Sequence, residues 1–286
     1  MAKEHALRPF FSRFFIAVPA VPQGDFLRGV CAVVKNLLIR ELEYFFGAVR
    51  FFTRLPVPGW VGHSAEALNH SARYFPAVGL IVGLIGALAF AVVSFILPKT
   101  LAVLAAMAAT IYATGAFHED GWADMVDGFG GGWTRERTLE IMKDSRIGSF
   151  GAIALVLMLL GKFVALIEVE VLLVAPALVA GHAFSRLCST TLLYFLDYAR
   201  EEGKAKPLAT RISLGELLCA TAFGCVALFM LPPTAAICGV ALALGATALL
   251  AMKIHSRLGG YTGDCLGATQ QLAELAFYTG MLCRFS

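Results

Sequence analysis

Long apolar segments alternate with short polar ones along most of this chain. Seven of them approach the roughly 20 apolar residues that an α-helix needs to cross about 30 Å of hydrocarbon. They cover residues 78–97, 100–117, 149–167, 171–196, 214–231, 235–252 and 265–282. The last one contains Gln270, Gln271 and Glu274, which indicate either a span or a buried, interfacial or cavity-lining helix. The pattern predicts an all-α, polytopic transmembrane helical bundle with six to seven spans.

The composition agrees with a lipid environment. The chain of 286 residues is 58% hydrophobic and 15% charged, whereas about a quarter of the residues in soluble domains are charged. A net charge of +3 is too small to indicate a nucleic-acid partner, so we expect none. The seven cysteines form no C-x-x-C pair and are interpreted as free packing residues.

The N-terminal region differs from the rest. Residues 8–17 are apolar and basic but too short to span, which predicts attachment at the membrane interface. We therefore divide the chain into an N-terminal extension, residues 1–37, and one membrane domain, residues 38–286.

Lysine and arginine lie mostly on one predicted side of the bundle. Nineteen of the 23 fall before residue 74, in residues 118–148 and 197–213, or just after residue 252. Short cytoplasmic loops retain positive charge. The N-terminus and the large polar loops are therefore predicted to be cytoplasmic, in a multi-pass protein of the inner membrane.

An acidic cluster follows the second apolar segment. Asp120, Asp124 and Asp127 are spaced i, i+4 and i+7, so a helix would place them on one stripe. Crowded carboxylates repel unless they share a cation, and oxygen ligands suit Mg²⁺ that holds substrate phosphates. Glu119 lies about 100° off the stripe, so we expect it either to support the metal ligands without binding the metal or to face solvent. The competing interpretation is a solvated acidic helix.

A basic segment precedes the third apolar run. Lys143 and Arg146 can supply positive charge for phosphate oxygens. Asp144 between them is a candidate fourth metal ligand or general base. The positive-inside pattern explains the two cations equally well.

Three ionisable residues fall inside apolar runs, where charge is costly and often functional. His182 and Arg186 share a face at i, i+4 and are candidates for a polar pocket or for packing, whereas Lys162 is placed to snorkel.

Two sets of glycines have different interpretations. Residues 259–268 form a glycine-rich turn before the last apolar helix, where backbone N–H groups can hold phosphate and Asp264 can cap the helix or bind metal. Gly79, Gly83 and Gly86 in the first span indicate close helix packing.

Five segments together resemble the cobalamin synthase family, the adenosylcobinamide-GDP ribazoletransferases. They are residues 52–58, 74–79, 118–128, 141–148 and 260–268, in family order, within a similarity that covers about residue 38 to the C-terminus. The resemblance implies transfer of α-ribazole, or its 5′-phosphate, to adenosylcobinamide-GDP with release of GMP. That reaction is the final step of cobalamin biosynthesis and requires Mg²⁺.

The resemblance also implies roles for particular residues. The metal ligands would be Asp120, Asp124 and Asp127. The residues that handle protons would be Asp144 and His118. Substrate would be bound by Lys143, Arg146, Asp264, Arg54, Arg186 and His182. The partners are the two substrates and the lipid bilayer, and the sequence assigns no oligomeric state.

Two alternatives come from the same residues. Asp124, Asp127 and Gly128 repeat the D-x-x-D-G opening of CDP-alcohol phosphotransferases, but Gly131 and Gly132 stand where Ala-Arg should follow. A corrinoid transporter is the other, suggested by the ionisable residues within spans. Transporters concentrate such residues at the midplane and often contain repeats, whereas this chain has most of its charge in loops and no internal repeat.

Overall fold

The computed structural model describes residues 23–62, 65–199 and 211–283. The chain divides into two units, Met1–Leu42 and Glu43–Ser286. In the first unit, the described residues belong to the start of helix α1 (Gln23–Phe52), where residues 34–40 are exposed. The segment 8–17 lies outside the described residues, so its attachment to the membrane interface stays a prediction.

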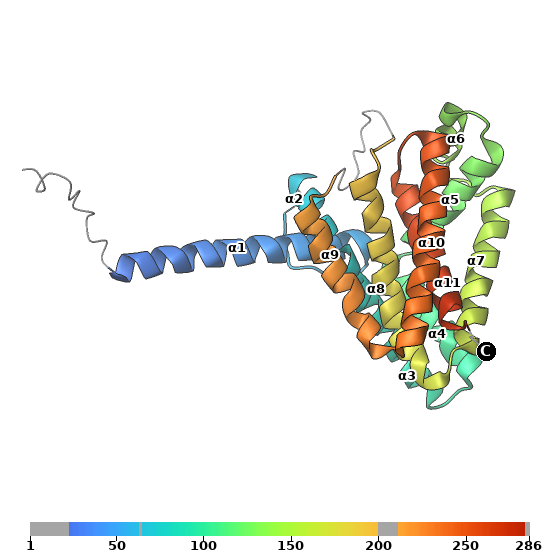
Figure 1. The fold of residues 1–286 in the computed structure, drawn as a ribbon, viewed down its shortest axis with the longest axis horizontal. Coiled ribbons are helices and arrows are strands. Elements are labelled where there is room, and N and C mark those ends of the chain that lie inside the picture. Colours follow the sequence, from blue (N-terminus) through green and yellow to red (C-terminus); the bar gives the residue numbers. More distant parts are fainter. Residues whose placement is uncertain (1–22, 63–64, 200–210, 284–286) are drawn as a thin grey trace, which may run out of the picture. The chain divides into compact units, whose positions relative to one another are not determined.

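The second unit is a bundle of helices, and no strand occurs among its described residues (Figure 1). After the end of α1 its elements are α2 (Ala65–Ser71), η1 (Ala72–Tyr74), α3 (Phe75–Ser94), α4 (Lys99–Thr114), α5 (Phe117–Gly131), α6 (Arg135–Ile141), α7 (Ser149–Glu168), α8 (Val171–Phe195), α9 (Leu214–Val226), η2 (Ala227–Met230), α10 (Pro233–Leu258) and α11 (Gly263–Met281). The all-α membrane bundle is confirmed.

Fewer helices meet the criteria for a span than the sequence predicts. Four described helices are long and apolar enough, namely Ala67–Ser94, α7, α8 and α10, and the pair α4 and α5, bent by 86°, would be a fifth. Leu214–Met230 is a shorter apolar helix, and α11 lacks the required hydropathy. The predicted number of six to seven is therefore not reached, because α9 is short and α11 carries polar residues.

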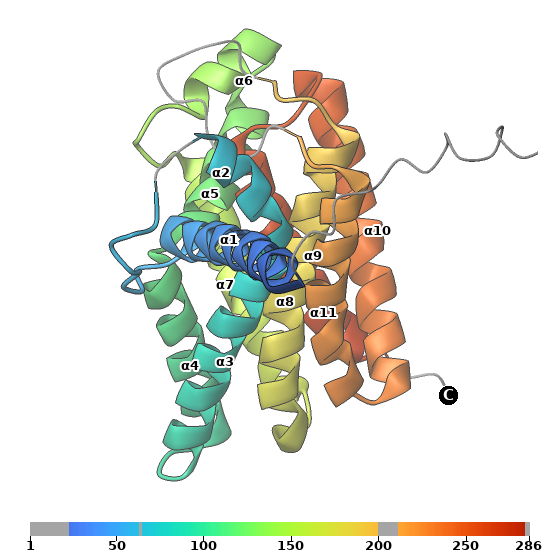
Figure 2. The same ribbon diagram turned by 90° about the vertical axis from the view of Figure 1, so that its left-hand side faces the viewer.

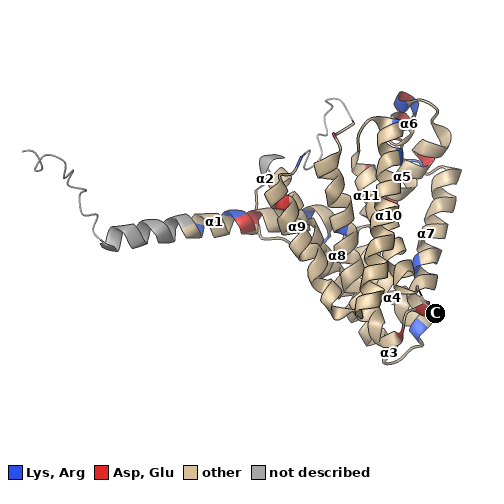
Figure 3. Ribbon diagram, viewed as in Figure 1, with Lys and Arg blue, Asp and Glu red and all other residues tan. Residues whose placement is uncertain are grey.

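The bundle has two unlike ends (Figures 1 and 2). The turns between α3 and α4, α7 and α8, and α9 and α10 gather at one end, at the bottom of both views. Helix α6 lies at the opposite end, where the basic residues that follow α5 are found (Figure 3). This separation matches the predicted division between tiny turns and polar loops.

Glycines let α3 approach its neighbours closely. A Cβ atom on Gly79 would lie 2.7 Å from Cα of Ala183, and one on Gly83 would lie 2.6 Å from Cα of Val179, both on α8. No larger side chain fits at these positions without moving the backbone, so the packing role predicted for these glycines is confirmed. The prediction of free cysteines is confirmed for Cys188, Cys219, Cys225, Cys238, Cys265 and Cys283.

Candidate functional site

The site begins where the chain breaks between α4 and α5. Gly115 has φ 66° and Ala116 has φ 60°, the left-handed region that ends helices. Arg54 packs beside this break. A Cβ on Gly115 would lie 2.8 Å from Nε of Arg54, and the backbone N–H of Arg54 donates to the Ala113 carbonyl at 2.8 Å. The break turns α5 by 86° away from the direction of α4.

The three aspartates lie on one helix, as the spacing predicts, but in different surroundings. Asp120 is exposed, Asp124 is half-buried and Asp127 is buried. Asp127 accepts the backbone N–H of Gly148 at 2.7 Å and that of Gly151 at 2.8 Å, one with each carboxylate oxygen. It therefore holds the N-terminus of α7 against α5. Its predicted metal role stays a prediction.

Helix α5 crosses the start of α11 at two glycines. A Cβ on Gly121 would lie 2.9 Å from the Asp264 carbonyl oxygen, and one on Gly267 would lie 3.3 Å from the His118 carbonyl oxygen. The crossing thus brings residues 118–128 against residues 260–268. The N-terminus of α11, capped by the Thr262 side chain, lies beside the part of α5 that bears Asp120 and Asp124.

The loop between α6 and α7 lies at the other end of α5, because Asp127 binds its last residue, Gly148. In this loop, Arg146 donates to Asp144 from two side-chain nitrogens, at 2.6 and 3.0 Å. These hydrogen bonds from the exposed guanidinium hold the pKa of Asp144 at about 2. Lys143 and Arg146 are exposed, so both can reach a ligand from solution.

These contacts place several predicted residues around one face of α5. We call the solvent-facing side of α5 that bears Asp120 and Asp124 the acidic strip. Arg54 lies at its start, Asp264 beside it, and the loop with Lys143 beyond its end. Nowhere in residues 23–62, 65–199 and 211–283 do three His, Cys, Asp or Glu residues form a group that could hold a metal ion. The carboxylates of the strip are therefore not assembled as a closed cage.

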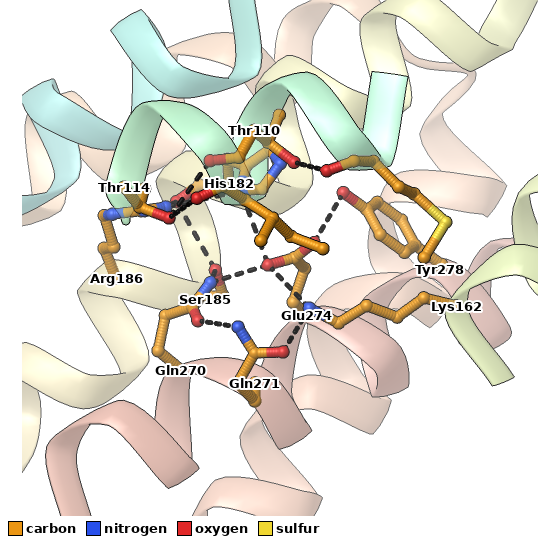
Figure 4. A network of polar contacts seen from close by, with 12 residues as sticks. Thr110, Thr114, Lys162, His182, Ser185, Arg186, Gln270, Gln271, Glu274 and Tyr278 are labelled. Atoms are coloured by element: carbon orange, nitrogen blue, oxygen red, sulfur yellow. Dashed lines mark hydrogen bonds and ion pairs between the residues drawn. The ribbon is translucent and has the colours of Figure 1, made fainter. Parts of the chain in front are cut away.

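A network of buried charges lies inside the bundle (Figure 4). Lys162 of α7 donates to Gln271 at 2.7 Å and pairs with Glu274 at 3.1 Å, both on α11. Glu274 also accepts from Gln270 at 2.6 Å and from Tyr278 at 3.2 Å. The Lys162 and Glu274 side chains are only 5% and 4% exposed, so their charges compensate each other away from water. Lys162 is buried in the bundle and does not snorkel.

His182 and Arg186 belong to the same network and not to the acidic strip. The Arg186 guanidinium donates to the His182 carbonyl at 2.9 Å, and His182 Nδ1 lies 3.4 Å from Glu274. Both are buried, as is His118, whose ring stacks on Phe52 with centroids 5.4 Å apart. The structure thus gathers these three residues in the interior. Contacts with Glu274 and with backbone carbonyls account for the ionisable residues inside the apolar helices.

Sequence reasoning missed the role of Glu274 and misplaced Glu119. Glu274 was noted only as a polar residue in an apolar helix, together with Gln270 and Gln271. The signal is that Gln270, Gln271 and Glu274, at i, i+1 and i+4, lie toward one side of α11, which favours the cavity-lining interpretation of this helix. The sequence predicts Glu119 behind the metal ligands or in solvent, but it is 8% exposed and accepts from Gln271 at 3.0 Å.

Arg135 is a further residue that the sequence had assigned only to topology. It donates to the Leu258 carbonyl at 2.8 Å and to the Ala199 carbonyl at 2.6 Å. Tyr261 joins the same region, because its carbonyl accepts the Ala199 N–H at 2.8 Å and its own N–H donates to Asp197 at 2.9 Å. These bonds fix the glycine-rich turn that precedes α11.

Comparison with known proteins agrees with the predicted resemblance. A protein of Shewanella amazonensis named adenosylcobinamide-GDP ribazoletransferase is 47% identical over 263 residues, 86% of this chain and 97% of that protein. Proteins of the same name from Shewanella frigidimarina and Shewanella woodyi are 45% and 44% identical, over 85% and 88% of this chain and 95% and 99% of theirs. No solved structure is similar to the chain.

The cobalamin-5-phosphate synthase family matches residues 44–282, which include the acidic strip, the loop after α6 and the whole of α11. The match and the identities confirm the resemblance that the five sequence segments indicated. This chain belongs to the cobalamin-5-phosphate synthase family.

Proposed function

We propose that the protein is a Mg²⁺-dependent membrane transferase. It joins α-ribazole, or its 5′-phosphate, to adenosylcobinamide-GDP and releases GMP. One observation supports this function most: the crossing of α5 and α11 brings the acidic strip against the N-terminus of a helix, while Arg54 and the basic loop border the strip. Carboxylates, backbone N–H groups and cations around one face are the parts that binding a diphosphate requires.

The acidic strip fits a magnesium ion. Mg²⁺ keeps several waters and is commonly bound by one or two carboxylates together with substrate phosphates, so a closed cage is not needed. Asp120 and Asp124 would hold it, because both reach the solvent-facing side of α5. When bound, the ion would neutralise charge on the diphosphate and on the departing GMP. Both oxygens of Asp127 accept backbone donors, so we assign Asp127 mainly to the position of α7.

The cations would bind the phosphate oxygens. Arg146 now points its guanidinium at Asp144, and both side chains are exposed, so exchanging this carboxylate for a phosphate costs little. Arg54 at the start of α5 and Lys143 in the loop would contact the diphosphate from the two ends of the strip. The backbone N–H groups at the start of α11 would add uncharged donors beside Asp264.

The proton of the attacking hydroxyl needs an acceptor. A pKa of about 2 makes Asp144 a weak base near neutral pH, since general bases work best when their pKa lies near the working pH. His118 is 3% exposed and faces Phe52, away from solvent. We therefore assign the proton to a carboxylate of the acidic strip and leave Asp144 the task of orienting Arg146.

The end of the bundle that bears α6 is proposed to face the cytoplasm of a cell bounded by an inner membrane. Helix α6 and the loop after it carry Arg135, Arg137, Lys143 and Arg146, whereas the turns from α3 to α4 and from α7 to α8, at the opposite end, border Lys99, Glu168 and Glu170. This distribution follows the positive-inside rule. Nucleotide substrates would then reach the acidic strip directly.

The test is an assay of GMP release by the purified protein with adenosylcobinamide-GDP and α-ribazole, in Mg²⁺ and in EDTA. We expect GMP release in Mg²⁺ but not in EDTA. Asp124→Asn should reduce the rate in Mg²⁺ roughly hundredfold, the scale for loss of one preorganised charge contact. Asp197→Asn is the matched control, because the Asp197 side chain is exposed and forms an ion pair with exposed Arg211. Full turnover in EDTA or in Asp124→Asn would refute the assignment. Uptake of labelled corrinoid by vesicles without GMP release would identify a transporter instead.

A further inference from the structure

Glu119 is next to Asp120 in the sequence, but its side chain is buried in the bundle whereas Asp120 is exposed. Its Oε1 accepts from Gln271 at 3.0 Å, and Gln271 in turn accepts from Lys162 at 2.7 Å. Through these two bonds Glu119 is joined to the Lys162–Glu274 ion pair between α7 and α11. A carboxylate on the helix of the acidic strip is thus tied to the buried network.

Two buried atoms in this network have no protein partner. Among the described residues, these atoms are Oε2 of Glu119 and Nε of Arg186. Glu119 and Arg186 are 8% and 2% exposed, and both line one small cavity together with Thr114 and His118. Buried polar groups without partners are costly, so each such atom indicates a missing ligand.

The chemistry of the cavity selects a water molecule. Its volume is about 10 Å³, near the minimum that one water needs. A water there can donate to Glu119 and accept from Arg186, and polar side chains such as Thr114 surround it. Buried waters typically satisfy two to four such groups. Glu119 and Glu274 face Arg186 here, and Lys162 pairs with Glu274 at 3.1 Å, so the two carboxylates and two cations balance without an added ion.

The position of Glu119 determines which way the acidic strip faces. Successive residues of an α-helix are turned by about 100°. Since Glu119 is fixed inward, Asp120 is turned about 100° from it and Asp124 about 140°, toward the exposed side of α5. Trp122 and Asp127 also hold α5, but both bind α7, at 3.1 Å to Ala154 and 2.8 Å to Gly151. Glu119 adds a hydrogen bond from α5 to a side chain of α11.

We propose that Glu119 is a positioning residue for the proposed transfer reaction: its buried carboxylate, bound to Gln271 and bridged by one water to Arg186, fixes the rotation of α5 so that Asp120 and Asp124 face the substrates. Glu119 itself touches neither substrate nor metal. The inference rests on the proposed function, since it assigns Glu119 to the same acidic strip. It also has a structural consequence that does not depend on activity.

The kinetic test uses Glu119→Gln, which keeps the shape of the side chain but removes its charge. We expect kcat to fall at least roughly tenfold with KM for adenosylcobinamide-GDP within about twofold, because misplacing a catalytic group by about 1 Å has large effects on rate. The double variant Glu119→Gln/Gln271→Glu exchanges amide and carboxylate and should recover part of kcat, since Gln270 Oε1 then loses the donor that it has in Gln271. Glu140→Gln is the control, because Glu140 is 69% exposed on α6 and pairs with Arg137.

The structural test measures how fast a maleimide labels Asp120→Cys from solution, relative to the same chain without this cysteine. Glu119→Gln should slow this labelling at least about twofold and the exchange variant should restore it. Unchanged labelling and unchanged kcat in Glu119→Gln would overturn the proposal, as would a kcat loss that the exchange variant does not reverse. If the wild-type protein released no GMP, the proposed function would fail, while the labelling result would still decide whether Glu119 sets the rotation of α5.

Discussion

Asp127 offers the sharpest test of how this site is held together, because its two oxygens serve two backbone donors at the start of α7. In Asp127→Ala the N–H groups of Gly148 and Gly151 lose their acceptor. The Gly151 bond is buried, so that donor loses about 1–3 kcal/mol, whereas the Gly148 bond is partly buried and water can replace part of it. The sum is about 2–4 kcal/mol, including the favourable position of a carboxylate at a helix N-terminus.

The measurement is the thermal unfolding midpoint of the purified protein in detergent. A loss of about 2–4 kcal/mol corresponds to a fall of roughly 4–16 °C for a chain of this size. Asp127→Asn keeps one acceptor oxygen and should lose about half as much. Asp197→Asn is the control, since Asp197 and Arg211 are both 79% exposed and such surface pairs contribute little.

The outcome also separates the two roles considered for Asp127. If its main task is to hold α7, the midpoint falls equally in EDTA and in Mg²⁺, because the lost donors are backbone groups. A fall seen only in Mg²⁺ would mean that Asp127 acts chiefly as a metal ligand. An Asp127→Ala midpoint equal to that of Asp197→Asn in both buffers would refute the reasoning altogether.

Two further predictions concern the interior and the helix crossing. Lys162→Met leaves Glu274 buried without its ion-pair partner and should cost about 3–5 kcal/mol, while Lys162→Met/Glu274→Gln should regain part of it; a double variant no more stable than the single one in thermal unfolding would contradict this. Gly121→Ala places a Cβ 2.9 Å from the Asp264 carbonyl, so α5 and α11 must separate and GMP release should fall at least about tenfold. A Cβ on Gly215 would meet open space, so Gly215→Ala should release GMP at the wild-type rate. Equal rates of GMP release in Gly121→Ala and Gly215→Ala would disprove the role of the crossing.

Which segments form helices could be predicted from the sequence, because helix formation here depends on local properties of the chain. Apolar runs of sufficient length fold as helices in lipid, where each backbone group needs a partner within its own segment. The i, i+4, i+7 spacing likewise places three aspartates on one helix without knowledge of any neighbour. The family could also be predicted, because the five matching segments follow one another in the family's order along the sequence.

The sequence did not determine what each acidic residue faces. Glu119 meets Gln271 across 152 positions of the chain, and Lys162 meets Gln271 across 109, so these pairs depend on how helices cross. The predicted number of six to seven spans is not confirmed for a related reason, since hydropathy along the chain does not reveal that α11 turns its polar residues toward buried partners.

What the sequence by itself determined is therefore the kind of element and the face on which chemistry lies: apolar helices, one acidic stripe and a basic loop beyond it. Only the tertiary structure decided that Asp127 binds the start of α7, that Gly121 packs against Asp264, and that Glu119 points inward. The physical reason is that helix periodicity is a property of a few consecutive residues. The direction of a side chain relative to another helix is set by close packing between segments far apart in the chain.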